Sequence, residues 1–146
     1  MKHSILSIIM LISFSMSTYS GNTKANYSDR DMQQSTIQVI DFHSTHRCET
    51  CLLIEKKAKS VLEKYFKPEM NSGLIHFKTV DVDKKENYAL AEEFEAAGTA
   101  LFINIITNGK STKIDLTDFA FLNVRSSDDA FENGFKSEVE KAVKLL

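Results

Sequence analysis

The two cysteines of this 146-residue chain, Cys48 and Cys51, lie three positions apart at the junction of two apolar patterns. Before them, residues 36–43 (TIQVIDFH) are short, apolar and β-branched, which predicts a buried strand. After them, apolar side chains recur at helical spacing until Pro68 and Gly73, which predicts an amphipathic helix. This apolar stripe consists of Cys51, Ile54, Ala58, Val61, Leu62 and Tyr65. The chain therefore places a CxxC pair where a strand gives way to a helix, and this constrains its fold more than any other feature.

The patterns that follow continue the alternation of strand and helix. Residues 74–83 (LIHFKTVDVD) predict a second strand, and residues 84–97 predict a second helix. The residues of that helix expected to face inward are Tyr88, Leu90, Ala91 and Phe94. Residues 101–107 and 110–116 flank Asn108-Gly109, a pair that favours a two-residue type I′ hairpin between antiparallel strands.

A closing helix is expected over residues 126–146, capped by Ser126. Its inward face consists of Phe131, Phe135, Val139, Ala142 and Leu146. Gly134 lies within this helix and weakens it by about 1 kcal/mol relative to alanine. The predicted order is β-α-β-α-β-β-α, which is an α/β fold with a central mixed sheet flanked by helices.

The N-terminus has the pattern of a secretory signal peptide over residues 1–20. Lys2 and His3 precede an apolar core, and the small residues Thr18 and Ser20 precede a cleavage point. A membrane anchor needs about 20 apolar residues, and serines interrupt this run, so we expect no stable anchor after cleavage. Residues 21–35 are polar and predict a flexible leader. The expected folded domain is 36–146, and the expected location is the periplasm.

The composition is that of a single globular domain, with 42% hydrophobic and 26% charged residues. The formal net charge is −2, and the lysines are dispersed among acidic residues. A nucleic-acid-binding domain would present a concentrated positive surface. We therefore expect no nucleic-acid partner.

The chain from Thr36 to Leu146 resembles the thioredoxin-like superfamily. The resemblance is carried by "VIDFHSTHRCETC", by "FKTVDVDKKENYALAEEFEAAGTALFI" and by "NGK" at the hairpin. Thioredoxins have a tryptophan before the first cysteine, Gly-Pro between the cysteines and a cis-proline opposite them. Here these positions are Arg47, Glu49-Thr50 and Ala100. The resemblance implies a thioredoxin-like fold and thiol–disulfide exchange.

A narrower resemblance is carried by "RCETC" and "DLTDFAFLNVRS". These motifs are similar to those of the small exported proteins known as the ArsF-type subunit of a nitrophenyl compound nitroreductase. Nitroreduction needs an electron carrier such as flavin, and this chain has no Gly-rich phosphate-binding loop. This resemblance therefore implies an accessory subunit that delivers electrons.

Cys48 is the expected nucleophile, because unpaired N–H groups and the dipole at a helix start favour thiolate over thiol. Arg47 adds positive charge, as do His43 and His46 when they are protonated; cysteines in such surroundings have pKa values of roughly 3.5–7.5. Cys51, one turn further along, is the expected resolving thiol. The expected partner is a protein or small molecule that carries a disulfide or thiol, and no bound cofactor is expected.

Asp41 is the third candidate catalytic residue. The resemblance implies that it manages the proton of the inner cysteine, as a buried acid does in thioredoxins. The spacing from Asp41 to Cys48 is one residue longer than in thioredoxins, so strand alternation could turn the side chain elsewhere. A hydrogen-bonded strand acid is the alternative.

Other functions are compatible with the same motif. Cys48, Cys51, His46 and His43 are ligand types for Cu(I), Zn or As(III), so a soft metal or metalloid binding module is one alternative. A structural disulfide is another, although so small a loop constrains the unfolded chain little. His76, in the middle of the second strand, is expected to be a packed or edge-strand residue.

A third function is a redox-inert domain that docks partners. The segment 118–125 is the candidate docking surface for such a domain, because it carries Phe119, Phe121 and Val124 beside Arg125. These residues are expected to pack in the core, with a docking edge as the alternative.

Overall fold

The computed structural model describes residues 35–146, except for the side chain of Asp128. The predicted signal peptide at 1–20 and almost all of the predicted leader at 21–35 lie outside the described residues. Within residues 35–146, no helix is both long and apolar enough to cross a membrane.

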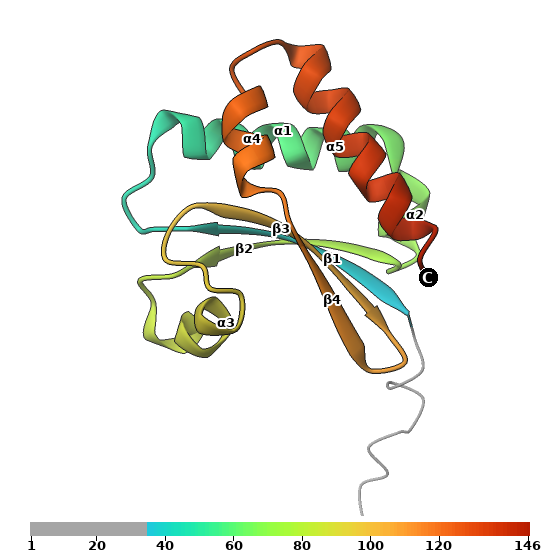
Figure 1. Cartoon of the computed structure of the whole chain (residues 1–146), viewed down its shortest axis with the longest axis horizontal. Coiled ribbons are helices and arrows are strands. Elements are labelled where there is room, and N and C mark those ends of the chain that lie inside the picture. The colour runs from blue at the N-terminus through green and yellow to red at the C-terminus, as the bar shows by residue number, and fades with distance from the viewer. Residues whose placement is uncertain (1–34) are drawn as a thin grey trace, which may run out of the picture.

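Four strands form one mixed sheet in the order β2-β1-β3-β4 (Figure 1). They are β1 (Thr36–His43), β2 (Ile75–Asp81), β3 (Ala100–Thr107) and β4 (Lys110–Asp115). β1 pairs in parallel with β2 and antiparallel with β3, and β3 pairs antiparallel with β4. The predicted hairpin is confirmed: Thr107 pairs with Lys110, and Asn108 and Gly109 have φ angles of 52° and 73°, as both central residues of a type I′ turn require.

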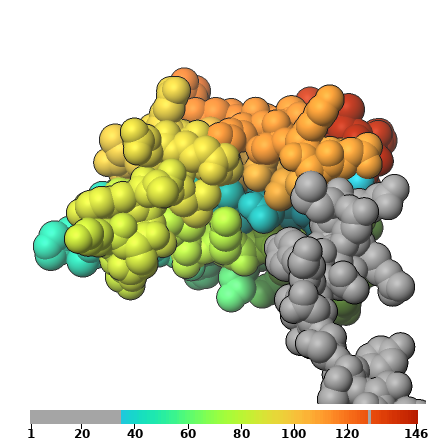
Figure 2. Space-filling view, turned by 90° about the horizontal axis from the view of Figure 1, so that it is seen from below, coloured from blue at the N-terminus to red at the C-terminus, as the bar shows by residue number. Residues whose placement is uncertain are grey.

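Helices cover both faces of the sheet unequally. One face carries α1 (Glu49–Tyr65), α2 (Lys67–Asn71), α4 (Thr117–Asn123) and α5 (Asp128–Val143) (Figure 1). The other face carries the short 3₁₀ helix η1 (Lys85–Asn87) and α3 (Tyr88–Glu93). Figure 2 looks at this second face and shows η1 and α3 in yellow-green beside the β3–β4 hairpin in orange. This element order and sheet topology are those of a thioredoxin-like fold, so the predicted fold class is confirmed.

The two faces hold separate apolar clusters. The larger cluster lies under α1, α4 and α5, and includes the completely buried Ile54, Leu62, Phe131 and Phe135. The smaller cluster lies under α3, where the rings of Phe42, Phe94 and Phe102 meet with centroids 5.3 to 5.8 Å apart. β1 contributes side chains to both clusters because its residues alternate between the faces.

Several local predictions were wrong in detail. Tyr88 is 54% exposed because α3 is only six residues long and buries Ala91. The cap of α5 is Ser127, whose hydroxyl accepts a hydrogen bond from the Ala130 N–H at 3.1 Å. The predicted helix does not run up to Pro68 and Gly73. It ends at Tyr65, and Pro68 lies in the first turn of a separate helix, α2, where its missing N–H is tolerated.

The segment 118–125 forms most of a helix, α4, that the sequence patterns did not predict. Ala120 and Val124 are buried, so the expectation of core packing holds for this face of the segment. Phe121 is 42% exposed, so the expectation of core packing is wrong for this residue, and its neighbour Leu122 is 77% exposed. His76 is exposed on β2, the edge strand, as predicted.

Candidate active site

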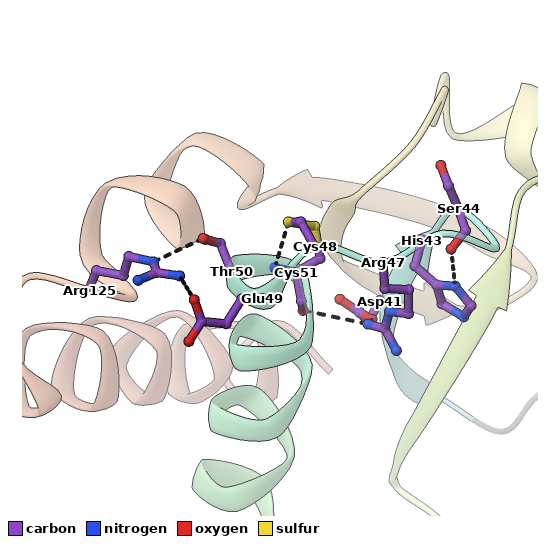
Figure 3. The surroundings of a disulfide bond; sticks show 9 residues. All are labelled: Asp41, His43, Ser44, Arg47, Cys48, Glu49, Thr50, Cys51 and Arg125. Atoms are coloured by element: carbon purple, nitrogen blue, oxygen red, sulfur yellow. Dashed lines mark hydrogen bonds and ion pairs between the residues drawn. A yellow bond between two sulfur atoms is a disulfide. The ribbon is translucent and has the colours of Figure 1, made fainter.

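The CxxC pair lies at the beginning of α1, beyond the carboxyl end of β1, and is joined as a disulfide (Figure 3). Cys48 is the N-cap residue, and its sulfur accepts a hydrogen bond from the Cys51 N–H at 3.1 Å. One of the unpaired donors at the helix start is thereby directed at this sulfur. The predicted position of Cys48 at a helix start is confirmed.

The two cysteines differ in exposure. Cys48 is exposed, whereas Cys51 is only 7% exposed and belongs to the buried face of α1. The difference arises because α1 begins at the surface and its first full turn already packs on the sheet. The exposed cysteine is the one predicted to be the nucleophile, and the buried cysteine is the one predicted to be the resolving thiol.

Asp41 is fully buried on β1, and its Oδ2 accepts a hydrogen bond from Arg47 Nη2 at 2.9 Å. Burial raises the pKa of the Asp41 carboxyl from 3.8 to about 7, although the Arg47 guanidinium opposes this rise. Figure 3 shows Asp41 and Arg47 together on the side of the CxxC pair that faces β1. Asp41 is thus both a buried acid and a hydrogen-bonded strand acid, so the two sequence interpretations do not exclude each other.

Arg47 makes contacts that the sequence did not predict. It was expected to favour the Cys48 thiolate, but its guanidinium is paired with two carboxylates, those of Asp41 and Glu55. Its Nη2 also makes a long contact of 3.5 Å with the Cys51 carbonyl oxygen. The effect of Arg47 on the Cys48 thiolate stays a prediction, and it concerns a guanidinium that is already paired with two carboxylates.

His43, at the end of β1, and His46, in the loop, do not form a metal site with the two cysteines. His43 Nδ1 is 3.0 Å from the Ser44 carbonyl oxygen, and His46 is exposed. Within residues 35–146, no three His, Cys, Asp or Glu side chains are placed to hold a metal ion. The four proposed soft-ion ligands are thus not assembled into a site.

Two side chains near the CxxC pair were not predicted as site residues. Glu55 is one turn beyond Cys51 on α1, and this four-residue spacing was the available signal. Arg125, in the turn that follows α4, donates to the Thr50 hydroxyl and the Glu49 carboxylate, each at 2.9 Å (Figure 3). No sequence signal links Arg125 to Thr50 and Glu49, which are 75 and 76 positions away, because the contact exists only once α4 packs beside α1.

Ala100 begins β3 and pairs with Phe42 of β1, so it lies at the same end of the sheet as the CxxC loop. It lines a surface hollow of about 470 Å³ together with residues 95–99, Phe102 and three side chains from the end of β4 and the start of α4. Those three are Asp115, Thr117 and Asp118. All peptide bonds between residues 35 and 146 are trans, so the loop at Ala100 differs from the cis-proline loop of thioredoxins.

Fold and site together define a thioredoxin-like domain with a CxxC disulfide. The sequence matches no family model and no curated protein. Among solved structures, the chain is similar to Fasciola hepatica thioredoxin, with a TM-score of 0.47 and 18% identity over 77% of this chain and 86% of that one. It is also similar to oxidized mitochondrial thioredoxin 3 of Saccharomyces cerevisiae, with a TM-score of 0.42 and 23% identity over 74% and 84% of the two chains.

A further similar structure is the zinc-bound form of human ERp44, with a TM-score of 0.45 and 15% identity. The match covers 81% of this chain and 29% of ERp44. These likenesses concern the fold alone. The assignment of the fold rests on the strand order and element order described above.

Proposed function

We propose that this chain is a thiol–disulfide oxidoreductase that exchanges disulfides through Cys48 and Cys51. The observation that supports it best is the asymmetry of the pair, with Cys48 exposed at the N-cap of α1 and Cys51 buried beside it. A nucleophile must be reached by the partner, whereas a resolving thiol needs only to reach the nucleophile.

In the reducing direction, the Cys48 thiolate attacks one sulfur of a partner disulfide. A bond forms between Cys48 and that sulfur, the partner's own S–S bond breaks, and the released partner thiolate takes up a proton. Cys51 then gives its proton to the Asp41 carboxylate and attacks the Cys48 sulfur. The Cys48–Cys51 bond forms, and the second partner thiolate leaves and is protonated, so two electrons pass to the partner. The reverse sequence introduces a disulfide into a partner dithiol.

The test is to replace the resolving thiol. Cys51→Ser should accumulate a mixed disulfide between Cys48 and the partner, because nothing remains to release it. Intact mass and non-reducing electrophoresis measure this product with a model disulfide, and Cys48→Ser is the matched control that should form none. Alkylation of the reduced wild type at limiting reagent and neutral pH should label Cys48 first; preferential labelling of Cys51 would reverse the assignment.

The direction of exchange follows from the reduction potential of the Cys48–Cys51 pair. A potential near that of thioredoxin, about −270 mV, indicates a reductant of partners, and one near −120 mV indicates an oxidant. Failure to equilibrate with any thiol–disulfide buffer would exclude both directions and favour a redox-inert docking domain. Stoichiometric binding of As(III) or Cu(I) by the reduced protein, without reduction of any model disulfide from about pH 5 to pH 9, would instead favour the soft-ion module.

The proposed setting is the periplasm, after export by the signal pattern at residues 1–20. There the pair would deliver electrons, as an accessory subunit, to a nitroreductase-type partner that carries its own flavin. The motifs "RCETC" and "DLTDFAFLNVRS" support this finer proposal. Reoxidation of the reduced chain by such a partner, in proportion to nitro substrate consumed, is the measurement that tests it.

A further inference from the structure

Arg47 immediately precedes the nucleophilic cysteine, yet its guanidinium points back toward β1 and α1. Its side chain is 16% exposed and lies between the carboxylates of Asp41, which is fully covered, and Glu55, which is 28% exposed. One nitrogen, Nη2, contacts both Asp41 Oδ2 and the Cys51 carbonyl. Arg47 therefore links the buried acid, the resolving cysteine and the second turn of α1.

The two oxygens of Asp41 are in different situations. Oδ2 accepts the hydrogen bond from Arg47, whereas Oδ1 is buried and has no hydrogen-bond partner among the described residues. A carboxyl oxygen that already accepts an N–H donor is the poorer site for a proton. A proton on Asp41 therefore belongs on Oδ1, which Arg47 leaves unoccupied.

The charges around Asp41 do not balance. Arg47 supplies one positive charge from the loop, and Glu55 supplies a second negative charge from α1. The sheet neighbours of Asp41 are Thr79 on β2 and Leu101 on β3, and neither is charged. Because Glu55 is partly exposed and Asp41 is not, the excess negative charge is relieved most readily by protonation of Asp41.

We propose that Arg47 and Glu55 are positioning residues for the resolving step, a proposal that rests on the disulfide-exchange function above. Arg47 holds Oδ2 and leaves Oδ1 to exchange the proton of Cys51. Glu55 offsets part of the charge of Arg47, so that Asp41 takes up and gives away this proton near neutral pH. Neither side chain touches the reacting sulfurs.

The proposal predicts opposite effects for two neutralising substitutions. Arg47→Gln removes the positive charge, so the pKa of Asp41 should rise by about one unit or more. Glu55→Gln leaves the charge of Arg47 uncompensated, so the pKa of Asp41 should fall by a similar amount. The carboxyl carbon of Asp41 reports this pKa directly in a ¹³C NMR titration of the oxidised protein.

The pH profile of the resolving step is the second readout. In single-turnover reactions that start from a preformed Cys48 mixed disulfide, release should speed up as Asp41 loses its proton. The midpoint of this profile should move to higher pH in Arg47→Gln and to lower pH in Glu55→Gln. Lys59→Gln and Glu63→Gln are matched controls on the exposed side of α1, and should move neither the titration nor the profile.

If Arg47 and Glu55 were only structural residues, both substitutions would lower stability and neither would move the Asp41 pKa in the predicted, opposite directions. Shifts of the Asp41 titration in the same direction, or no shift in either variant, would overturn the proposal. Arg47→Lys keeps the positive charge and should bring the Asp41 pKa back toward that of the wild type, which also covers the case that Arg47→Gln does not fold. The carboxyl titration needs no exchange activity, so its outcome is independent of the proposed function.

Discussion

Asp41 is a buried ionisable side chain whose effect on stability depends on pH. It lies in the central strand with no exposed surface, and burial raises the pKa of its carboxyl to about 7 despite the neighbouring guanidinium of Arg47. A carboxyl with this pKa can accept and return a proton near neutral pH. The same shift makes the ionised carboxylate unfavourable in the folded protein.

The pH dependence of stability follows from this shift. Between about pH 4 and pH 7 the folded protein retains a proton on Asp41 that the unfolded chain has lost, so the free energy of unfolding should fall as pH rises, by up to about 1.4 kcal/mol per pH unit. Asp41→Asn cannot ionise and should lack this decline. Urea denaturation of the oxidised protein at a series of pH values measures both curves.

The matched control for this prediction is Asp118→Asn, at an exposed position on α4. The free energy of unfolding of Asp118→Asn should decline with pH as that of the wild type does. Parallel curves for the wild type and Asp41→Asn would show that folding does not raise the pKa of Asp41.

The contact between α4 and α5 depends on a glycine in the middle of a helix. A Cβ at Gly134 would lie 2.5 Å from Cε2 and 2.7 Å from Cζ of Phe119. The Phe119 ring also packs against Phe131, with centroids 5.7 Å apart. Gly134 therefore makes room for the aromatic side chain that attaches α4 to α5, and α4 in turn carries Arg125 to the CxxC loop.

Gly134→Ala separates helix propensity from packing. In an isolated helix this change stabilises by about 1 kcal/mol, but here the added methyl group overlaps Phe119, so the protein should lose about 1–3 kcal/mol. In a Phe119→Ala background the overlap is gone, and the same substitution should become stabilising. A double-mutant cycle by urea denaturation measures the coupling; additive effects would rule out the packing explanation.

The architecture places the CxxC pair beyond the carboxyl end of a central strand, whereas Asp41 on that strand is buried. β1 is a central strand, paired on both sides, and its polypeptide continues directly into the CxxC loop and α1. The larger apolar cluster fixes α1 on one face, and the aromatic cluster under α3 fixes the carboxyl end of β1 on the other. The segment that carries the exposed Cys48 is thereby anchored by both apolar clusters.

Processing of the N-terminus is the prediction that concerns the whole chain. We propose that residues 1–20 are removed on export, because the signal pattern ends before the polar stretch 21–35 and the first strand begins only at Thr36. The intact mass of protein recovered from the native exported fraction should lack these residues. A mass that includes Met1 to Ser20 would indicate an anchored protein.

The order of the main elements could be predicted from the sequence because it depends on local patterns. The apolar run 36–43, the helical stripe from Cys51 to Leu62 and the Asn108-Gly109 turn each encode their structure within a few residues. The position of Cys48 at a helix start followed from the same patterns. The helix α4 was missed because its seven residues are too few for a clear period, and it is stabilised by packing against α1 and α5.

The electrostatics of the site could not be predicted, because they depend on which side chains the fold brings together. The sequence suggested that Arg47 would stabilise the thiolate of its neighbour Cys48, but in the folded chain the guanidinium is paired with Asp41 from β1 and Glu55 from α1. Burial decides the pKa of Asp41, and burial arises only when strands and helices pack. Local periodicity therefore determined where the cysteines stand, whereas long-range packing determined which charges surround them.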